Sequence, residues 1–315
     1  MPKPRLAKPG AERRRFTPDV ILTFNVGDNP PRLLEFLRQA MPDRKRTTVK
    51  DYLKYRQVMI GSEVTTKWDY ELKKGDVVKV NTSREFQVFS NPRLKIMYED
   101  DDIIVVNKGY GLLSIGTDTK STGTAYWILR DYVKRIDPRN KIFIVHRLDQ
   151  HTSGLMMFAK NEKAKNAMQH NWNNMVLDRR YVAVVEGQIE PPSGTIDSWL
   201  AENSVHKVYP TGQEGVGQRA VTHYTTLASN SRYSLVELQL STGRKNQIRA
   251  HMEQIGHPIA GDKRYGSSAS PIHRLALHAQ TLRFIHPITR RDMNFSLPIP
   301  SGFGRLVGFN PNKKQ

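Results

Sequence analysis

One aspartate stands where a reactive group could be held firmly. Asp149 lies in the polar stretch 146–154, between the apolar runs 142–145 and 155–159. Short runs of β-branched and aromatic residues are typical of strands, and a polar stretch ending in Ser-Gly is typical of a loop. The pattern therefore predicts a carboxylate on a loop that buried strands fix at both ends, where reactive groups are often carried. Taken alone, a loop aspartate is more often a solvated turn residue.

Two further stretches contain residues that composition does not explain. One is 179–181, with the sequence Arg-Arg-Tyr at the start of a predicted strand. In the other, Ile248, Met252 and Ile255 mark the buried side of a helix and put Arg249 beside it, near the helix start. An arginine held there can pair with a carboxylate from a neighbouring loop. Without the other two stretches, a surface arginine on an amphipathic helix would be the better interpretation.

The charge of the chain indicates a polyanionic partner. Its 315 residues include 49 Lys and Arg against 30 Asp and Glu, which gives a formal net charge of +19 and a pI of about 10.0. Such a charge favours nucleic acid through counterion release. A membrane surface is the second candidate, but no apolar run is long enough to span a bilayer. Cysteine is absent, which fits a reducing compartment, and the N-terminus has no secretory h-region, so we expect a cytoplasmic protein.

Several common chemistries find no support in the motifs. The glycine-rich stretch 215–220 fits the dinucleotide fingerprint, but a strand-like run follows it where a helix is needed, so it predicts a loop. No phosphate-binding loop ends in Gly-Lys-Ser/Thr, and neither 112–116 nor Ser153 has the frame of a serine-hydrolase elbow. The ten histidines lack a zinc spacing. We therefore expect no metal site.

Residues 19–82 predict a small basic domain. Helices are expected to open at 32–37 and at 47–53, the second with Thr47 as its cap, and strands at 58–60 and 77–80. This unit resembles the S4 RNA-binding domain, although that family usually has a glycine ahead of its valine strand where this chain has 56–58. The resemblance implies a basic face that binds structured RNA, made by Arg44, Lys45, Arg46, Lys50, Lys54 and Arg56. The alternative is a basic domain with solvated lysines.

The larger part of the chain predicts an α+β fold with a mainly antiparallel, mixed sheet. A hairpin is expected at 96–108, and helices at 124–132 and 161–177. Closely spaced strands with few helices between them favour antiparallel pairing. Besides the strands flanking Asp149, the expected strands are 179–185, 221–227, 235–240, 275–278 and 282–284.

Together, these motifs resemble the RluA-type family of pseudouridine synthases. The resemblance is carried by His-Arg-Leu-Asp with Thr-Ser-Gly at 146–154, Arg-Tyr-Val-Ala-Val-Val-Glu-Gly at 180–187 and Thr-Gly-Arg with Gln-Ile-Arg-Ala-His at 242–251. Asn107-Lys108, Gly261-Asp262 and Leu277-His278-Ala279 agree, in family order, between about residues 98 and 298. Two places depart from the family pattern. Asn246 stands where the family often has His, which we expect to tune packing or RNA contact, and Gln150-His151 fall in a variable part of the loop.

The resemblance implies an enzyme that isomerises uridine in RNA without cofactor or metal. Asp149 would be the catalytic carboxylate and Arg249 its ion-pair partner, while Tyr181 would contact the base and is the candidate for removing the C5 proton. Arg147 would fill the gap left by the flipped uridine, and His146 and Leu148 are assigned with it to substrate binding. We expect structured RNA as the partner, namely large-subunit ribosomal RNA, since an S4-like domain favours structured RNA. We also expect a monomeric protein. The alternatives are a tRNA-directed synthase and a catalytically silent RNA-binding assembly factor.

The predicted organisation has five parts. They are a basic disordered tail (1–18), an S4-like RNA-binding domain (19–82), a linker (83–93), a pseudouridine synthase catalytic domain (94–300) and a C-terminal tail (301–315).

Overall fold

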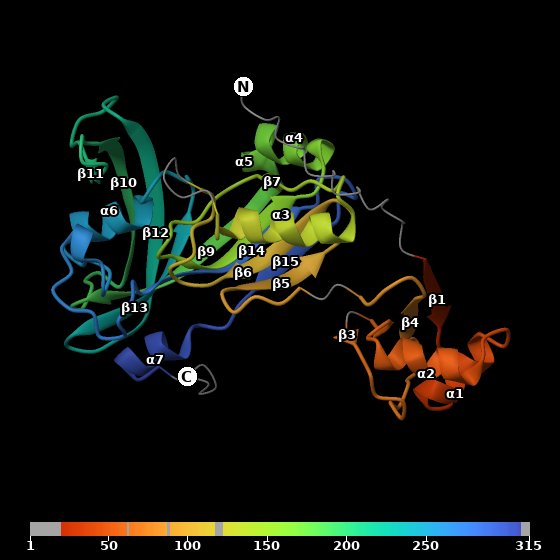
Figure 1. The fold of residues 1–315 in the computed structure, drawn as a ribbon. Coiled ribbons are helices and arrows are strands. Elements are labelled where there is room, and N and C mark those ends of the chain that lie inside the picture. The colour runs from red at the N-terminus through yellow and green to blue at the C-terminus, as the bar shows by residue number, and fades with distance from the viewer. Residues whose placement is uncertain (1–19, 62, 87–88, 117–121, 310–315) are drawn as a thin grey trace, which may run out of the picture. The chain divides into compact units, whose positions relative to one another are not determined.

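The described part of the chain forms two compact units. The computed structural model describes residues 20–61, 63–86, 89–116 and 122–309 (Figure 1). Of the described residues, those up to Phe86 together with Lys134–Arg139 form one unit, and the others from Phe89 onward form the second. The division after Val88 falls inside the predicted linker 83–93. The predicted basic tail 1–18 lies outside the described residues.

The smaller unit packs two helices against a four-stranded sheet. Its strand order is β1-β4-β2-β3 with antiparallel pairing, and its core includes Leu33, Leu37, Val49 and Val78. The elements are β1 (Ile21–Asn25), α1 (Leu33–Ala40), α2 (Arg46–Lys54), β2 (Val58–Ile60), β3 (Glu63–Val64) and β4 (Val77–Asn81). The two helices and two of the strands were predicted. The capping prediction was wrong, because α2 begins one residue before Thr47 and its N-cap is Lys45, which makes no side-chain cap.

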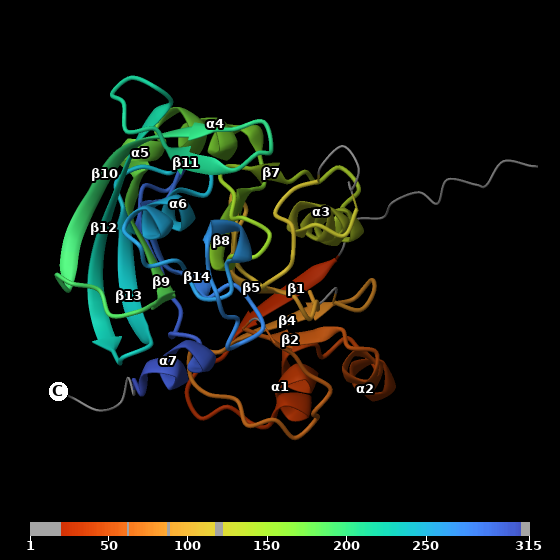
Figure 2. The same cartoon turned by 90° about the vertical axis from the view of Figure 1, so that its left-hand side faces the viewer.

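The larger unit is built on one eleven-stranded sheet. Its main path runs β11-β10-β12-β13-β9-β14-β8-β6-β5, with β15 on β14 and β7 on β8. Figure 2 shows β10, β12 and β13 side by side. The strands are β5 (Leu94–Glu99), β6 (Ile103–Lys108), β7 (Phe143–Ile144), β8 (Ser153–Ala159), β9 (Val176–Glu186), β10 (Ser193–Glu202), β11 (Val208–Pro210), β12 (Gln218–Ser229), β13 (Tyr233–Leu240), β14 (Leu277–Ile285) and β15 (Asp292–Ser296).

Only one of these pairings is parallel, that of β14 with β8. The neighbouring pairs, including β6 with β8 and β9 with β14, are antiparallel. The prediction of an α+β fold with a mainly antiparallel mixed sheet is therefore confirmed, as is the hairpin of β5 and β6.

Helices cover both faces of the sheet where the predicted catalytic loop emerges. All seven residues of β8 are buried. Met156 and Phe158 pack with α3 (Ala125–Ile136), whereas Leu155 and Met157 face α4 (Glu162–His170) and α5 (Trp172–Met175). A strand buried on both faces reads as a continuous apolar run, which is the pattern of 155–159. The remaining helices are α6 (Gln247–Gln254), the short 3₁₀ helix η1 (Lys263–Tyr265) and α7 (Ser301–Val307).

Three predicted elements differ from the structure. The helix expected at 161–177 breaks at Asn171 into α4 and α5, and its last residues open β9. The strands expected at 275–278 and 282–284 belong to one strand, β14. It continues through the polar residues between them because it pairs with β9 and with β15. The predicted tail 301–315 begins with α7, whose Phe303 is 1% exposed and belongs to the core. Residues 310–315 of that tail lie outside the described residues.

In the described part of the chain, no helix is both long enough and apolar enough to cross a bilayer.

Gly154, at the start of β8, makes a close backbone approach that no other residue type allows. Its φ is +117°, and a Cβ there would lie 2.1 Å from the carbonyl oxygen of Ala279 on β14. We predict that Gly154→Ala lowers the free energy of unfolding by at least about 2 kcal/mol, since both strain and overpacking oppose it. Thermal or urea unfolding measures this. Gly212→Ala is the matched control, because φ is also positive there but no atom lies within 4 Å of the added Cβ. Equal stability of the two variants would contradict the prediction.

Candidate active site

The loop between β7 and β8 is fixed by hydrogen bonds of three side chains. The backbone N–H of Met157 donates to Nε2 of His146 at 2.9 Å. Ser114 Oγ donates to the carbonyl oxygen of Leu148 at 2.6 Å and accepts from its N–H at 3.2 Å. Lys108 Nζ donates to the carbonyl oxygen of Gln150 at 3.2 Å. The loop that carries Asp149 is thus held on both sides of that residue.

Lys108 is a fully buried lysine that contacts this loop. Its Nζ also donates to the carbonyl oxygens of Gly109 and Leu112, at 3.2 and 2.8 Å. Burial lowers its pKa to about 7, while the negative charge of Asp149 acts in the opposite direction. The motif Asn107-Lys108 was noticed in the sequence, but nothing in its spacing predicted a lysine that fixes the catalytic loop.

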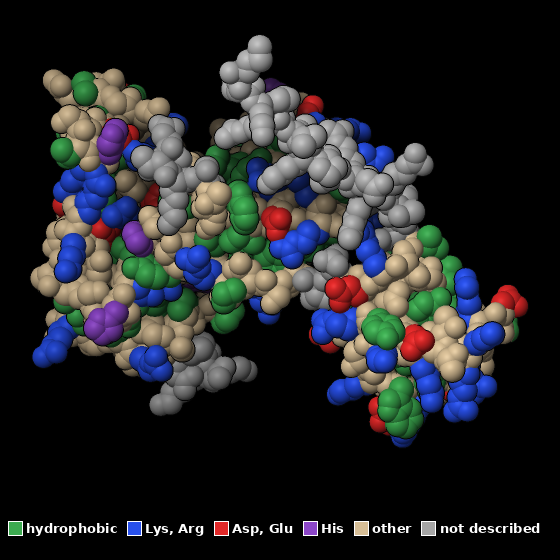
Figure 3. Space-filling model, in the orientation of Figure 1, with side chains coloured by type: hydrophobic (Ala, Val, Ile, Leu, Met, Phe, Trp, Pro, Cys, Tyr) green, Lys and Arg blue, Asp and Glu red, His purple; other side chains and the backbone are tan. Residues whose placement is uncertain are grey.

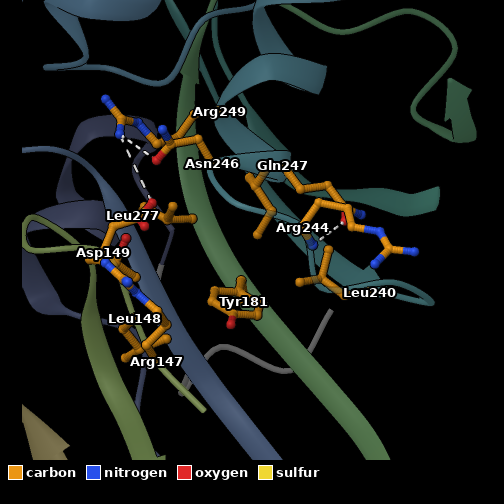
Figure 4. Close-up of a pocket in the computed structure, with 12 residues that line it drawn as sticks. Arg147, Leu148, Asp149, Tyr181, Leu240, Arg244, Asn246, Gln247, Arg249 and Leu277 are labelled. Atoms are coloured by element: carbon orange, nitrogen blue, oxygen red, sulfur yellow. Dashed lines mark hydrogen bonds and ion pairs between the residues drawn. The ribbon is translucent and has the colours of Figure 1, made fainter. Parts of the chain in front are cut away.

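Asp149, Tyr181 and Arg249 line one cavity, together with Arg147 and Leu148 (Figure 4). They come from the β7–β8 loop, from β9 and from α6. The other lining residues are Thr152, Leu240, Arg244, Asn246, Gln247, Ile248 and Leu277. The structure therefore brings together the three residues that the sequence nominated as catalytic, although they are up to 100 positions apart.

Arg249 is held mainly by Asp262, a partner that the prediction missed. Its Nε and Nη2 donate to the two carboxylate oxygens of Asp262 at 2.7 and 2.8 Å, and the Asp262 side chain is 2% exposed. Asp149 lies farther away, with Oδ2 3.9 Å from Nη1 of Arg249. The predicted pair therefore exists as a charge contact, while the two-pronged hydrogen-bonded pair is made with Asp262.

Two neighbours complete the environment of Arg249. Its guanidinium carbon lies 4.6 Å from the ring centroid of the buried Tyr265. Asn246 Oδ1 accepts from Nη1 at 2.9 Å. Asn246 is the N-cap of α6 with φ +51°, a left-handed conformation that Asn tolerates better than most residues. Asn246, the residue that departs from the family pattern, thus contacts Arg249.

The start of α6 is tied to β12 through Gln247. This side chain is buried, donates to the carbonyl oxygen of Val221 and to Thr222 Oγ1, and accepts from Thr242 Oγ1 and the Arg244 N–H, at 2.7–3.0 Å. All of its polar groups have partners, so it fixes the loop before the helix.

Burial and the neighbouring cations act in opposite directions on the ionisation of Asp149. Burial raises its pKa, while Arg249, Arg147 and Lys108 lower it. Its side chain is 29% exposed, so a ligand can reach it. Such an arrangement suits a carboxylate that must be ionised and weakly solvated beside a developing positive charge.

Tyr181 lines the same cavity from β9. Burial raises the pKa of its phenol, the charge of Asp149 raises it further, and Arg179 acts in the opposite direction. The phenol is therefore neutral near pH 7.

The other predicted substrate residues fall in different places. Arg147 is exposed at the cavity, and Leu148 lines it. His146 is not among the lining residues. Its ring accepts the hydrogen bond from the Met157 N–H of β8, and its centroid lies 5.0 Å from that of the Trp172 ring. Burial is the main cause that lowers the pKa of His146 to about 3. These contacts make His146 a support of the loop, and its assignment to substrate contact stays a prediction.

Within the described ranges, one group of side chains has the residue types and the spacing to hold a metal ion. Asp100, Asp102 and His286 approach one another closely. However, Asp100 accepts from Tyr98, from His286 and from two backbone N–H groups, and Asp102 accepts from Asn161. These bonds account for the group as support for the β5–β6 turn.

Comparison with known proteins identifies the family. A family model described as RNA pseudouridylate synthase matches residues 102–254. The protein YlyB of Bacillus subtilis, named an uncharacterized RNA pseudouridine synthase, is 36% identical over 91% of this chain and 96% of its own length. The chain belongs to the RNA pseudouridylate synthase family. Ribosomal large subunit pseudouridine synthase D of Escherichia coli K12 is 31% identical over 91% of this chain and 94% of its own.

A solved structure agrees. Human RNA pseudouridylate synthase domain containing 4 superposes with a TM-score of 0.55 at 25% identity, over 66% of this chain and 90% of that one. The resemblance to RluA-type enzymes is therefore confirmed, and the chain is a pseudouridine synthase.

The ion pair with Asp262 holds the Arg249 guanidinium 3.9 Å from Asp149, so we expect that weakening it affects the chemical step. We predict that Asp262→Asn lowers the single-turnover rate of pseudouridine formation by about 10²-fold, since a misplacement near 1 Å has that effect. RNA affinity should change little because Asp262 is buried. A loss of affinity with an unchanged rate would contradict this assignment. Circular dichroism and thermal unfolding check that the variant is folded.

The charge balance at Asp149 predicts a pH effect. Activity should rise with pH as Asp149 ionises, with a midpoint above its ordinary value of 3.8. Arg147→Gln removes a cation that lowers this pKa, so the acid limb of the single-turnover rate should move to higher pH. The exposed Arg232→Gln is the control. An acid limb that stays in place, or moves to lower pH, would show that Arg147 does not act on the charge of Asp149.

Proposed function

We propose that this pseudouridine synthase isomerises specific uridines of large-subunit ribosomal RNA, with Asp149 as the catalytic carboxylate. The observation that carries the proposal is the convergence of Asp149, Arg249 and Tyr181 on one cavity with Arg147 at its edge. The ribosomal target is supported by similarity to an enzyme named for the large ribosomal subunit over 91% of this chain. We further propose that the protein acts in the cytoplasm as a monomer.

The chemistry conserves all atoms. The bond between uracil N1 and ribose C1′ breaks, the base turns, and a bond from C5 to C1′ forms while C5 loses its proton and N1 gains one. Breaking a bond at C1′ develops oxocarbenium character, which a carboxylate stabilises or captures, as in glycosidases. Asp149 is the group in the cavity suited to this, and Arg249 keeps it ionised and aimed. Because nothing is oxidised and no group is added, the proposed sequence requires no cofactor or metal.

The target uridine must leave its stack to reach Asp149. Flipping a base costs a few kcal/mol, and a side chain that occupies the vacated space offsets part of that cost. Arg147 is exposed beside Asp149, and its planar guanidinium can stack on neighbouring bases. We propose this role for it, with Leu148 contacting the flipped nucleotide.

Tyr181 is proposed to contact the uracil ring. A phenol whose pKa is raised is a poor base until it loses its proton, so the surroundings of Tyr181 favour stacking over proton abstraction in the free enzyme. Removal of the C5 proton stays a proposal for this residue, and it requires that the bound RNA change its environment.

The smaller unit is proposed to bind structured RNA as an S4-like domain. The predicted basic-face residues Arg44, Lys45, Arg46, Lys50, Lys54 and Arg56 are all exposed. Lys and Arg side chains are spread over this unit in Figure 3. Arg56 has φ +58°, the left-handed conformation that glycine adopts most easily, which accounts for the glycine usual in the S4 family at the approach to this strand.

The assignment of Asp149 predicts a sharp separation of activity from binding. Asp149→Asn should abolish pseudouridine formation, while RNA affinity stays within about threefold of wild type because the change removes one charge and little volume. Single-turnover assays and filter binding measure the two. Retained activity in this variant would refute the assignment.

The RNA target is tested by mapping pseudouridines with carbodiimide and reverse transcription, in total RNA from cells with and without this protein. Stops lost in large-subunit ribosomal RNA support the proposal and name the sites. Stops lost only in tRNA would replace the target with tRNA. Unchanged stops with intact RNA binding would favour the silent assembly factor.

A further inference from the structure

Two adjacent arginines on β9 have opposite surroundings. Arg180 is neutralised, since its Nε donates to Asp178 at 2.8 Å and its Nη1 donates to Glu237 at 3.0 Å. Arg179 points to the other face of the strand, the face of Tyr181, because side chains alternate along a strand. Among the residues that the structure describes, none accepts a hydrogen bond from Arg179 or forms an ion pair with it.

The Arg179 guanidinium is nevertheless held in place. Its central carbon lies 5.8 Å from the centroid of the Trp172 ring. On another side it meets the loop after β13 at Gly243, where a Cβ would stand 2.6 Å from Nη1. A glycine at this position leaves the space that the guanidinium occupies. The arginine is thus confined by an aromatic ring and a backbone without being paired.

A second cavity, of about 290 Å³, opens at this arginine. Trp172, Leu177, Asp178, Arg179 and Ser241 are among its lining residues, and Leu240 lines both this cavity and the catalytic one. The Asp178 carboxylate here is already used, by Arg180 at 2.8 Å and by Gln239 at 3.2 Å. Arg179 therefore supplies the unpaired charge of the cavity.

Burying a cation without a counter-ion costs free energy, and binding of an anion beside it offsets that cost. Arginine is well suited to a phosphate, because its planar fork donates two parallel hydrogen bonds. In RNA, the anion beside a flipped nucleotide is the phosphodiester that joins it to its neighbour.

We propose that Arg179 and its cavity bind a phosphodiester of the RNA strand next to the target uridine, with Trp172 holding the guanidinium. This proposal rests on the proposed function, since it places the strand that leads into the catalytic cavity. Contact with one phosphate contributes affinity and fixes the position of the strand, while it carries no base identity. Arg179 is therefore a positioning residue.

The test is binding of a hairpin RNA with uridines in its loop, measured by filter binding over a range of salt concentrations. Arg179→Gln should weaken binding about tenfold, as expected for one charge-assisted contact. It should also lower the slope of log affinity against log salt by about 0.7 to 0.9, the value for one phosphate. Arg179→Lys, which keeps the charge, should keep that slope. Arg232→Gln, which removes an exposed charge at the far end of β13, is the matched control.

A second measurement locates the phosphate. Hairpins are prepared with a single neutral methylphosphonate linkage at each loop position in turn. At one loop position, the neutral linkage should weaken binding to the wild-type protein about tenfold. The same linkage should hardly weaken binding to Arg179→Gln, because this variant has already lost the contact with that phosphate. Gly243→Ala, which crowds the guanidinium, should lose part of the affinity without any change of charge.

Equal slopes for Arg179→Gln and Arg232→Gln, or the absence of any coupled linkage, would overturn the proposal. Because these measurements record binding alone, their result is separate from that of pseudouridine mapping. A phosphate contact found in a protein that forms no pseudouridine would refute the proposed function and keep this site.

Discussion

The ion pair between Arg249 and Asp262 is the interaction on which the active site depends. Both carboxylate oxygens of Asp262 are occupied by Arg249, so the remaining guanidinium nitrogen is directed toward Asn246 and Asp149. An arginine paired fully with Asp149 would block that carboxylate. Held instead at 3.9 Å, it supplies positive charge and leaves the oxygens of Asp149 free for the role that we propose for them.

The sheet brings the other half of the site to this ion pair. β8 is buried on both faces, and Ser114 and Lys108 fasten the loop before it. This loop leads into the strand that pairs in parallel with β14, which in turn pairs with β9 at Tyr181. A buried polar network of this kind is stable only when every member has a partner, and the lysine amine has three carbonyl acceptors. The rigid surroundings fit a reaction in which a flipped base must meet a fixed carboxylate.

Local patterns in the sequence predicted most of the elements, and the motif resemblance nominated Asp149, Tyr181 and Arg249, which the structure brings to one cavity. The apolar runs around Asp149 and the helical spacing of Ile248 and Met252 were sufficient to place two of the three site residues on their elements. Asp262 could not be predicted as the partner of Arg249, since it lies in an irregular segment whose position depends on long-range packing. The support that His146 gives to the loop was not predicted either, because a residue that supports a loop and one that touches substrate look alike in a motif.

The most direct test of this account is a double-mutant cycle on the single-turnover rate of pseudouridine formation, with Arg249→Lys, Asp262→Asn and the double variant. If Asp262 acts by holding Arg249, the double variant should be little slower than Arg249→Lys alone, because lysine cannot use the two-pronged anchor. Losses that simply add on a free-energy scale would contradict the account and show that the two residues act independently on the reaction.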